Sequence, residues 1–128
     1  MRIREDQIAF RRLSAIIQSF IDGSTIPVAL EQDHEQAQWA RLDPASREVW
    51  EIRVRHVKPD TELRISGRFA AIDTFVALNL YDYPIKGKRA WDQVKMRCQT
   101  DWQALFPTSP PLFGDKINDY ISANVTLI

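Results

Sequence analysis

The sequence predicts an α+β fold in which a central antiparallel sheet of three to four strands has helices packed mainly on one face. Between Glu48 and Tyr81, apolar and polar residues alternate with a period of two, which is typical of half-buried antiparallel strands. On either side, Glu5–Asp22 and Ala90–Phe106 carry apolar residues at steps of three and four, which is typical of amphipathic helices. We expect residues 1–128 to form a single domain, because a chain of 128 residues can bury a sufficient core.

The first predicted helix, Glu5–Asp22, begins near Asp6 and ends before Gly23, and both residues are suitable helix termini. We interpret it as a helix that covers the core, and the alternative is an amphipathic helix that binds a partner. Its apolar stripe consists of Ala9, Phe10, Leu13, Ile16, Ile17 and Phe20.

A linker, Ser24–Val28, is expected to lead into a second and more polar helix, Ala29–Leu42. A helix with so many polar residues usually lies on the surface. Asp43 should end it, because a residue that precedes proline is disfavoured in helical conformation.

Three strands are predicted between Glu48 and Tyr81, with turns at Lys58–Thr61 and Ile72–Asp73. Successive side chains of a strand point to opposite faces, and antiparallel sheets usually bury one face and expose the other. We therefore expect helices over the apolar face and water over the other. The apolar sets are Trp50, Ile52 and Val54, then Leu63, Ile65 and Phe69, then Val76, Leu78 and Leu80, and the opposite face holds Arg53, Arg55, Arg64 and Arg68.

After the sheet, a loop over Asp82–Arg89 contains proline, glycine and the cations Lys86, Lys88 and Arg89. The helix Ala90–Phe106 should follow and stop at Pro107. A short last helix is expected over Lys116–Ala123, and Val125–Ile128 is expected to add an edge strand or to fray.

Composition limits the classes of partner and of site. The formal net charge is +0 at pH 7, which gives the whole chain no general attraction to nucleic acid or to anionic membrane. Cys98 is the single cysteine, so no intrachain disulfide can form, as is usual in the cytoplasm. The N-terminal residues do not follow a signal-peptide pattern, and no stretch approaches the ~20 apolar residues that span a bilayer. We expect a cytoplasmic protein without membrane contact.

No motif for a metal or a cofactor is present. His34 and His56 are the only histidines, and no spacing matches a zinc or calcium site. The four glycines are isolated, so no glycine-rich loop could cradle a phosphate. Cys98 lies on the apolar stripe of its helix, where we interpret it as a packing residue rather than a nucleophile.

The predicted arginine face is the one constellation that suggests chemistry. Guanidinium groups suit bidentate contact with phosphate, so this face could hold an RNA backbone or stabilise charge that develops during phosphodiester cleavage. The alternative is a structural face on which carboxylates such as Glu51 and Glu62, or the acids of the segment Ala29–Leu42, neutralise the arginines. The cationic set consists of Arg53, Arg55, Arg64 and Arg68, together with Lys86, Lys88 and Arg89.

Parts of this stretch resemble the RelE/HigB-like toxin superfamily of toxin–antitoxin systems. The resemblance covers roughly residues 48–102, although the chain is neutral rather than basic and continues beyond the last helix. Its segments are Trp50-Glu51-Ile52-Arg53, similar to an aromatic-Glu-Leu-Arg strand of the family, then Leu63-Arg64-Ile65, Phe75-Val76-Ala77-Leu78 and the cations Lys86, Lys88 and Arg89.

The resemblance implies a metal-independent endoribonuclease that cleaves messenger RNA on the ribosome and is silenced by an antitoxin-like partner. Under this hypothesis the catalytic residues are Arg53, Arg64 and Arg68. The residues that bind RNA are then Arg55, Lys86, Lys88 and Arg89.

The alternative function is a non-catalytic protein-interaction domain, accessory to a mobile or phage-derived element. It is motivated by the neutral charge, by the lack of a catalytic motif and by Trp39, Tyr81 and Tyr83, since exposed aromatic residues often anchor interfaces. The two hypotheses differ in whether the arginines are free or are bridged to carboxylates.

Overall fold

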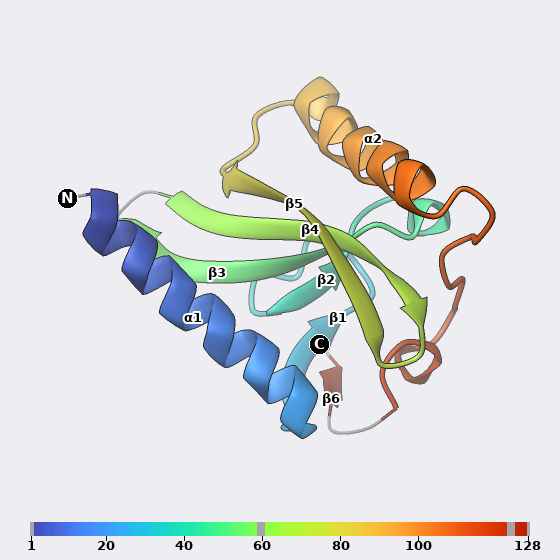
Figure 1. The fold of residues 1–128 in the computed structure, drawn as a ribbon, viewed down its shortest axis with the longest axis horizontal. Coiled ribbons are helices and arrows are strands. Elements are labelled where there is room, and N and C mark those ends of the chain that lie inside the picture. Colours follow the sequence, from blue (N-terminus) through green and yellow to red (C-terminus); the bar gives the residue numbers. More distant parts are fainter. Residues whose placement is uncertain (1, 59–60, 123–124, 128) are drawn as a thin grey trace.

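A computed structural model describes residues 2–58, 61–122 and 125–127, which form an α+β fold (Figure 1). Two helices flank one mixed sheet whose strands lie in the order β5-β4-β3-β2-β1-β6. The elements are α1 (Arg2–Asp22), β1 (Ile26–Ala29), β2 (Trp39–Arg41), β3 (Trp50–Lys58), β4 (Thr61–Ala71), β5 (Thr74–Tyr83), α2 (Lys88–Leu105) and β6 (Val125–Leu127), with 3-10 turns at Ala45–Arg47 and Ile117–Asp119.

β3 and β4 have the predicted register, whereas the predicted apolar face of the third strand is wrong. A bulge between Ala77 and Asn79 places Leu78 against Cys98 on one face and Leu80 opposite Ile65 on the other. β3, β4 and β5 are antiparallel, with Ile52 opposite Ile65 and Arg53 opposite Arg64. The turn at Ile72–Asp73 joins β4 to β5 as predicted. The turn predicted between β3 and β4 includes residues 59 and 60, which lie outside the described residues.

The sheet is larger than predicted, because two short strands extend it beyond β3. β2 pairs antiparallel with β3, whereas β1 pairs in parallel with both β2 and β6. The expected edge strand at the C-terminus is thus confirmed as β6. A pure antiparallel sheet of three to four strands was wrong, because β1 pairs in parallel with the nearby β2 and with the distant β6.

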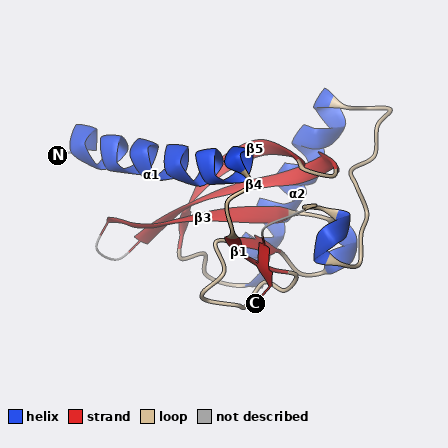
Figure 2. Ribbon diagram, turned by 90° about the horizontal axis from the view of Figure 1, so that it is seen from below, coloured by secondary structure: helices blue, strands red, loops and turns tan. Residues whose placement is uncertain are grey.

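The face of β3 that carries Trp50 and Ile52 packs against α1, which lies along one side of the sheet (Figure 2). Ile16 of α1 belongs to this core, and Phe20 stacks on Trp39 with ring centroids 4.9 Å apart. Tyr120 closes the far end of the core at 4.8 Å from the ring of Trp50. The predicted core-covering stripe of the first helix is confirmed in part, because Leu13, Ile16 and Phe20 pack into the core, whereas Phe10 and Ile17 of the same stripe are exposed.

The opposite face of the sheet is covered as well. Val49 precedes Trp50 and so points the other way, where it packs with Leu42 and with Cys98 of α2. α1 and α2 thus lie on opposite faces, and the prediction that helices pack mainly on one face was wrong. The physical reason is that the arginine face, which looked suited to water, is dry around its buried ion pairs.

No helix forms over Ala29–Leu42. The residues give β1, an irregular segment 30–38 and β2, because main-chain pairing of these strands with each other, with β3 and with β6 outweighs a weak local helical pattern. Trp39, expected to be an exposed anchor, is 1% exposed in the core. At the C-terminal end, the predicted helix over residues 116–123 is reduced to the turn Ile117–Asp119.

Candidate functional site

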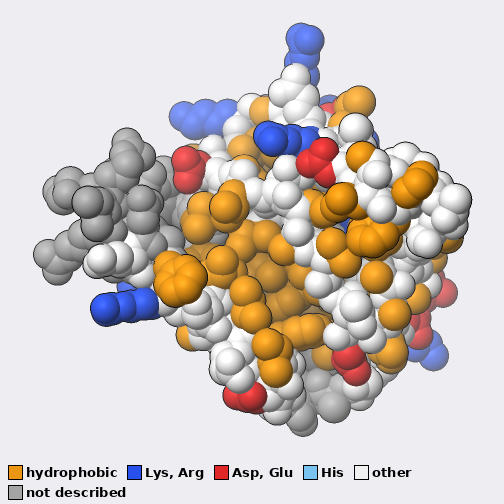
Figure 3. Space-filling model, in the orientation of Figure 1, with side chains coloured by type: hydrophobic (Ala, Val, Ile, Leu, Met, Phe, Trp, Pro, Cys, Tyr) orange, Lys and Arg blue, Asp and Glu red, His pale blue; other side chains and the backbone are white. Residues whose placement is uncertain are grey.

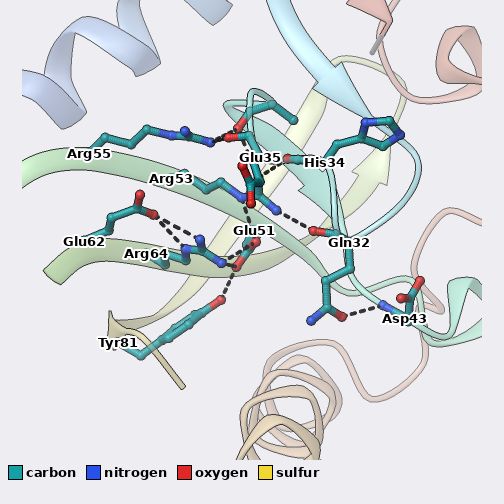
Figure 4. Close-up of polar contacts among 11 residues, drawn as sticks. Gln32, His34, Glu35, Asp43, Glu51, Arg53, Arg55, Glu62, Arg64 and Tyr81 are labelled. Carbon is teal, nitrogen blue, oxygen red and sulfur yellow. Dashed lines mark hydrogen bonds and ion pairs between the residues drawn. The ribbon is translucent and has the colours of Figure 1, made fainter. Parts of the chain in front are cut away.

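The predicted arginine face is built around one buried carboxylate. Glu51 on β3 is 0% exposed and accepts hydrogen bonds from Arg53 Nε and from Arg64 Nη1, each at 2.9 Å (Figure 4). The Tyr81 hydroxyl of β5 donates to the same carboxylate. Glu62 supplies a second carboxylate to Arg64 at 3.0 Å. Two of the three predicted catalytic arginines therefore meet, but they meet on carboxylates.

Burial and the neighbouring carboxylate of Glu51 keep the Tyr81 hydroxyl protonated. Burial, followed by the charge and hydrogen bond of Glu51, raises the pKa of Tyr81 far above its usual value. The phenol therefore stays neutral and can only donate to Glu51. A carboxylate that is bridged in this way satisfies both guanidinium groups, and breaking such a buried arrangement costs about 3–5 kcal/mol.

The remaining donors of Arg53, together with Arg55, hold the irregular segment 30–38 over the sheet. Arg53 Nη2 donates to the carbonyl of Gln32 at 2.6 Å, and Nη1 donates to the carbonyl of His34. Arg55 Nη2 donates to the carbonyl of Ala37 at 2.9 Å. Figure 4 shows the segment crossing beside both arginines. The segment expected to bring acids to this face instead brings main-chain carbonyls.

Arg68, the third predicted catalytic residue, has partners of its own further along β4. Its guanidinium donates to the carbonyl oxygens of Arg47 at 2.5 Å and Glu48 at 3.4 Å, and lies 5.8 Å from the ring centroid of Trp102. Burial is the main cause that lowers the pKa of Arg68 below the usual arginine value. Its contacts are those of a residue that joins β4 to the turn before β3 and to α2.

The predicted RNA-binding cations of the loop differ from the strand arginines in being exposed. Lys86 lies in the loop before α2, and Lys88 and Arg89 lie in its first turn. None of the three forms an ion pair with another described residue.

An open depression of about 450 Å³ lies over the arginine face. Its lining carries both signs of charge, and the ring of Tyr83 covers the guanidinium of Arg64 at 3.4 Å. No group of three or more histidine, cysteine, aspartate or glutamate side chains in the described part of the chain could hold a metal ion. The depression is lined by Gln32, Asp33, His34, Glu35, Arg53, Arg55, Glu62, Arg64, Tyr83 and Trp91.

A second buried polar group was not predicted. The Tyr120 hydroxyl donates to Glu48 Oε1 at 2.5 Å, and Arg41 Nη1 donates to the Tyr120 hydroxyl at 2.8 Å. The Gly114 amide donates to Glu48 Oε2 at 3.1 Å. Burial and Glu48 raise the pKa of Tyr120. Glu48 and Tyr120 are 72 residues apart, so no local sequence pattern could have joined them.

Comparison with protein-family models, with curated proteins and with solved structures finds no match for this chain. Within the described residues, neither helix offers a stretch long and apolar enough to cross a membrane.

Proposed function

We propose that the protein is a non-catalytic protein-interaction domain. The observation that carries this proposal is the exposure of large apolar side chains on α1 and on the edge strand β5. Phe10, Ile17 and Ile21 of α1 are 71%, 42% and 69% exposed, and Leu80 of β5 is 62% exposed. Exposed apolar residues that gather in one place, rather than singly, mark interaction sites.

The state of the arginine face supports the same choice over RNA cleavage. Arg53 and Arg64 are 3% and 6% exposed and are bridged by Glu51. A phosphate group would have to displace that carboxylate and leave it buried without a partner, which is costly. The ribonuclease hypothesis, with an RNA or ribosomal substrate and an antitoxin-like partner, remains a prediction that rests on the resemblance and on the exposed cations Lys86, Lys88 and Arg89.

The two functions predict opposite results in a paired experiment. We expect the purified full-length protein to leave a messenger RNA substrate intact in the presence of a chelator, and its induction to leave growth unchanged. In extract from the source cells, it should elute at a larger mass than the purified chain. The change Leu80→Asp should reduce that mass to the monomer value, whereas Met96→Asp, an exposed apolar residue of α2, should not.

Metal-independent cleavage that is lost when Lys86, Lys88 and Arg89 are changed to alanine would contradict this proposal and favour the ribonuclease. These three side chains are exposed, so the triple variant should fold. Substitution of Arg53 or Arg64 would be a poorer test, because loss of a buried partner can unfold the chain.

A further inference from the structure

The buried group of Glu48 and Tyr120 has a third member, Arg41, whose hydrogen bonds are incomplete. Arg41 on β2 is 7% exposed, and its Nη1 donates to the Tyr120 hydroxyl at 2.8 Å and to the carbonyl of Gly114 at 2.9 Å. Its Nε donates to the carbonyl of Leu30 at 3.4 Å. These contacts hold the guanidinium group in one orientation.

The other terminal nitrogen of Arg41, Nη2, has no hydrogen bond or ion pair with a described residue. The polar side-chain atoms that are enclosed without a partner are Nε1 of Trp39 and of Trp50, Oγ of Ser66 and Nδ2 of Asn79. Nη2 is not among them, so it keeps exposed surface and its two N–H groups can donate. A cation that is more than nine-tenths buried thus presents a free charged donor.

This donor belongs to an open depression between β2, the β4–β5 turn and the loop after α2. The depression has a volume of about 770 Å³ and is lined by Arg41, and sites for small ligands commonly have ~300–1,000 Å³. Part of its lining is apolar, because Ile72 and Phe113 are 47% and 61% exposed there. It therefore combines an apolar surface with a charged donor, as ligand sites do.

Apart from Arg41, the charged residues that line this depression are acids. Glu48 is buried and already hydrogen-bonded, whereas Asp115 and Asp119 are exposed. The backbone amides of Lys116 and Asp115 donate to Asp119 and lower its pKa, so this carboxylate is ionised at neutral pH. The Asp115 carboxylate has no partner among the described residues, which leaves it free for a cationic group.

The free donor, the free carboxylate and the apolar surface match the three parts of one kind of small molecule. We propose that this depression binds a free α-amino acid with an apolar side chain. The ligand carboxylate accepts from Arg41 Nη2, since guanidinium groups bind carboxylates strongly. The ligand ammonium group faces Asp115, and its side chain lies against Ile72 and Phe113, where burial of apolar surface is favourable.

An acid without an amino group, or an amine without an acid group, matches only part of the site. The acid would bring its charge close to Asp115 and Asp119 without a cation to balance it, and like charges at a binding surface disfavour association. The amine would leave Arg41 Nη2 without an anionic partner. This site does not depend on the proposed function, which rests on exposed apolar side chains such as those that gather on the face shown in Figure 3.

Titration of the full-length, ¹⁵N-labelled protein with L-leucine, followed by NMR, tests the site. We expect saturable shifts of the backbone amide signals of Gly114 and Asp115, with a dissociation constant of about 1 mM or lower. Leucinamide lacks the carboxylate, and N-acetyl-leucine lacks the ammonium group. Each should bind at least about tenfold more weakly than leucine.

Variants of the lining locate the ligand. Asp115→Asn and Phe113→Ala change exposed side chains, so both variants should fold, and thermal unfolding checks this. Each should weaken leucine binding about threefold or more, because one loses the charge that faces the ammonium group and the other loses apolar contact. The matched controls on α2, Asp101→Asn and Leu105→Ala, should leave the affinity unchanged.

Three results would overturn the inference. They are the absence of saturable shifts, leucine binding no tighter than that of leucinamide or N-acetyl-leucine, and an affinity that neither Asp115→Asn nor Phe113→Ala lowers. The proposed interaction function has a separate readout, the elution of the Leu80→Asp variant in cell extract, so failure of one leaves the other standing.

Discussion

Glu51 is the residue on which the arginine face depends, because two guanidinium groups and a phenol share its buried carboxylate. We predict that Glu51→Gln lowers the free energy of unfolding by about 3–5 kcal/mol, since it leaves the buried guanidinium of Arg53 without its carboxylate and that of Arg64 with Glu62 alone. Urea denaturation at pH 7 measures this loss.

Glu62 provides the matched control. Its side chain is 25% exposed and, among the described residues, forms an ion pair with Arg64, so Glu62→Gln should cost about 1 kcal/mol or less. Equal losses for the two variants would show that Glu51 is not the centre of the network.

The buried thiol of Cys98 should make the free energy of unfolding fall at alkaline pH. Burial raises the pKa of its thiol from 9.0 to about 11. Between these values the folded chain keeps a proton that the unfolded chain has lost, so stability is fully present below pH 9 and falls as the pH rises through 11. A shift of this size corresponds to about 2–3 kcal/mol.

The prediction is checked by urea denaturation from pH 8 to pH 11 for the wild type and for Cys98→Ala. The alanine variant should lose stability through the cavity at every pH, and its curve should be flatter than that of the wild type between pH 9 and 11. Tyr81 and Tyr120 are present in both chains, so their titration cancels in the comparison. Parallel curves would contradict the prediction.

At the scale of the elements, the spacing of apolar residues predicted those helices and strands whose formation depends on local sequence. α1, α2 and the register of β3 with β4 follow from the spacing of apolar residues. β1 and β2 have four and three residues, too few for a pattern, and β1 also depends on β6, far along the chain. The polar composition of residues 30–38 was mistaken for a surface helix because nothing local shows that their carbonyls are acceptors for arginines.

Local sequence also predicted part of the candidate site, namely which side chains share a face of the sheet. Strand alternation placed Arg53, Arg55 and Arg64 on one face, and the structure brings them together there. What covers that face could not be predicted, because burial depends on contacts with segments elsewhere in the chain. The same limit hid the group of Glu48 and Tyr120.

The segment 30–38 should be released when its arginine clamp is weakened. We predict that Arg53→Lys speeds cleavage of the native protein by an endoprotease specific for glutamate, at Glu31 and Glu35. A single ammonium group cannot keep contact with Glu51 and with the carbonyls of Gln32 and His34. A loss of about 1.4 kcal/mol in local stability raises the cleavage rate about tenfold.

Arg97→Lys is the control for this experiment, because Arg97 is exposed on α2, and its cleavage pattern should equal that of the wild type. Unfolding by urea, measured alongside, separates local release from global loss of stability. Cleavage that rises equally at all sites in the Arg53→Lys variant would argue against a local clamp.

Gly67 allows β4 and β5 to approach at the bulge between them. A Cβ atom there would lie 2.2 Å from the carbonyl oxygen of Val76 and 2.6 Å from the ring of Phe75. We predict that Gly67→Ala lowers the free energy of unfolding by about 2 kcal/mol or more, since backbone must move. Ala70→Ser, an exposed change on the same strand, should stay within about 0.5 kcal/mol. Thermal and urea denaturation of both variants test the difference.

At the scale of the whole molecule, the sheet is covered unequally on its two faces. α2 and the segment 30–38 cover the arginine face, whereas α1 covers only part of the apolar face. Polar alternation alone would have suggested the reverse, with the arginine face open to water. The face that is covered only in part is therefore the apolar one.

Exposed apolar side chains on a chain with no net charge should limit solubility. The formal net charge is +0 at pH 7, so weak association is not opposed by repulsion between molecules. We predict that the double variant Ile17→Glu, Leu80→Lys raises the saturation concentration at pH 7 several-fold, since it removes two residues of one patch and keeps the net charge. The control Met96→Lys, Leu105→Glu also removes two exposed apolar residues, but they lie half a turn apart around α2. Similar gains for both pairs, measured after centrifugation at equal temperature and salt, would mean that total apolar exposure, and not the positions of Ile17 and Leu80, sets the solubility.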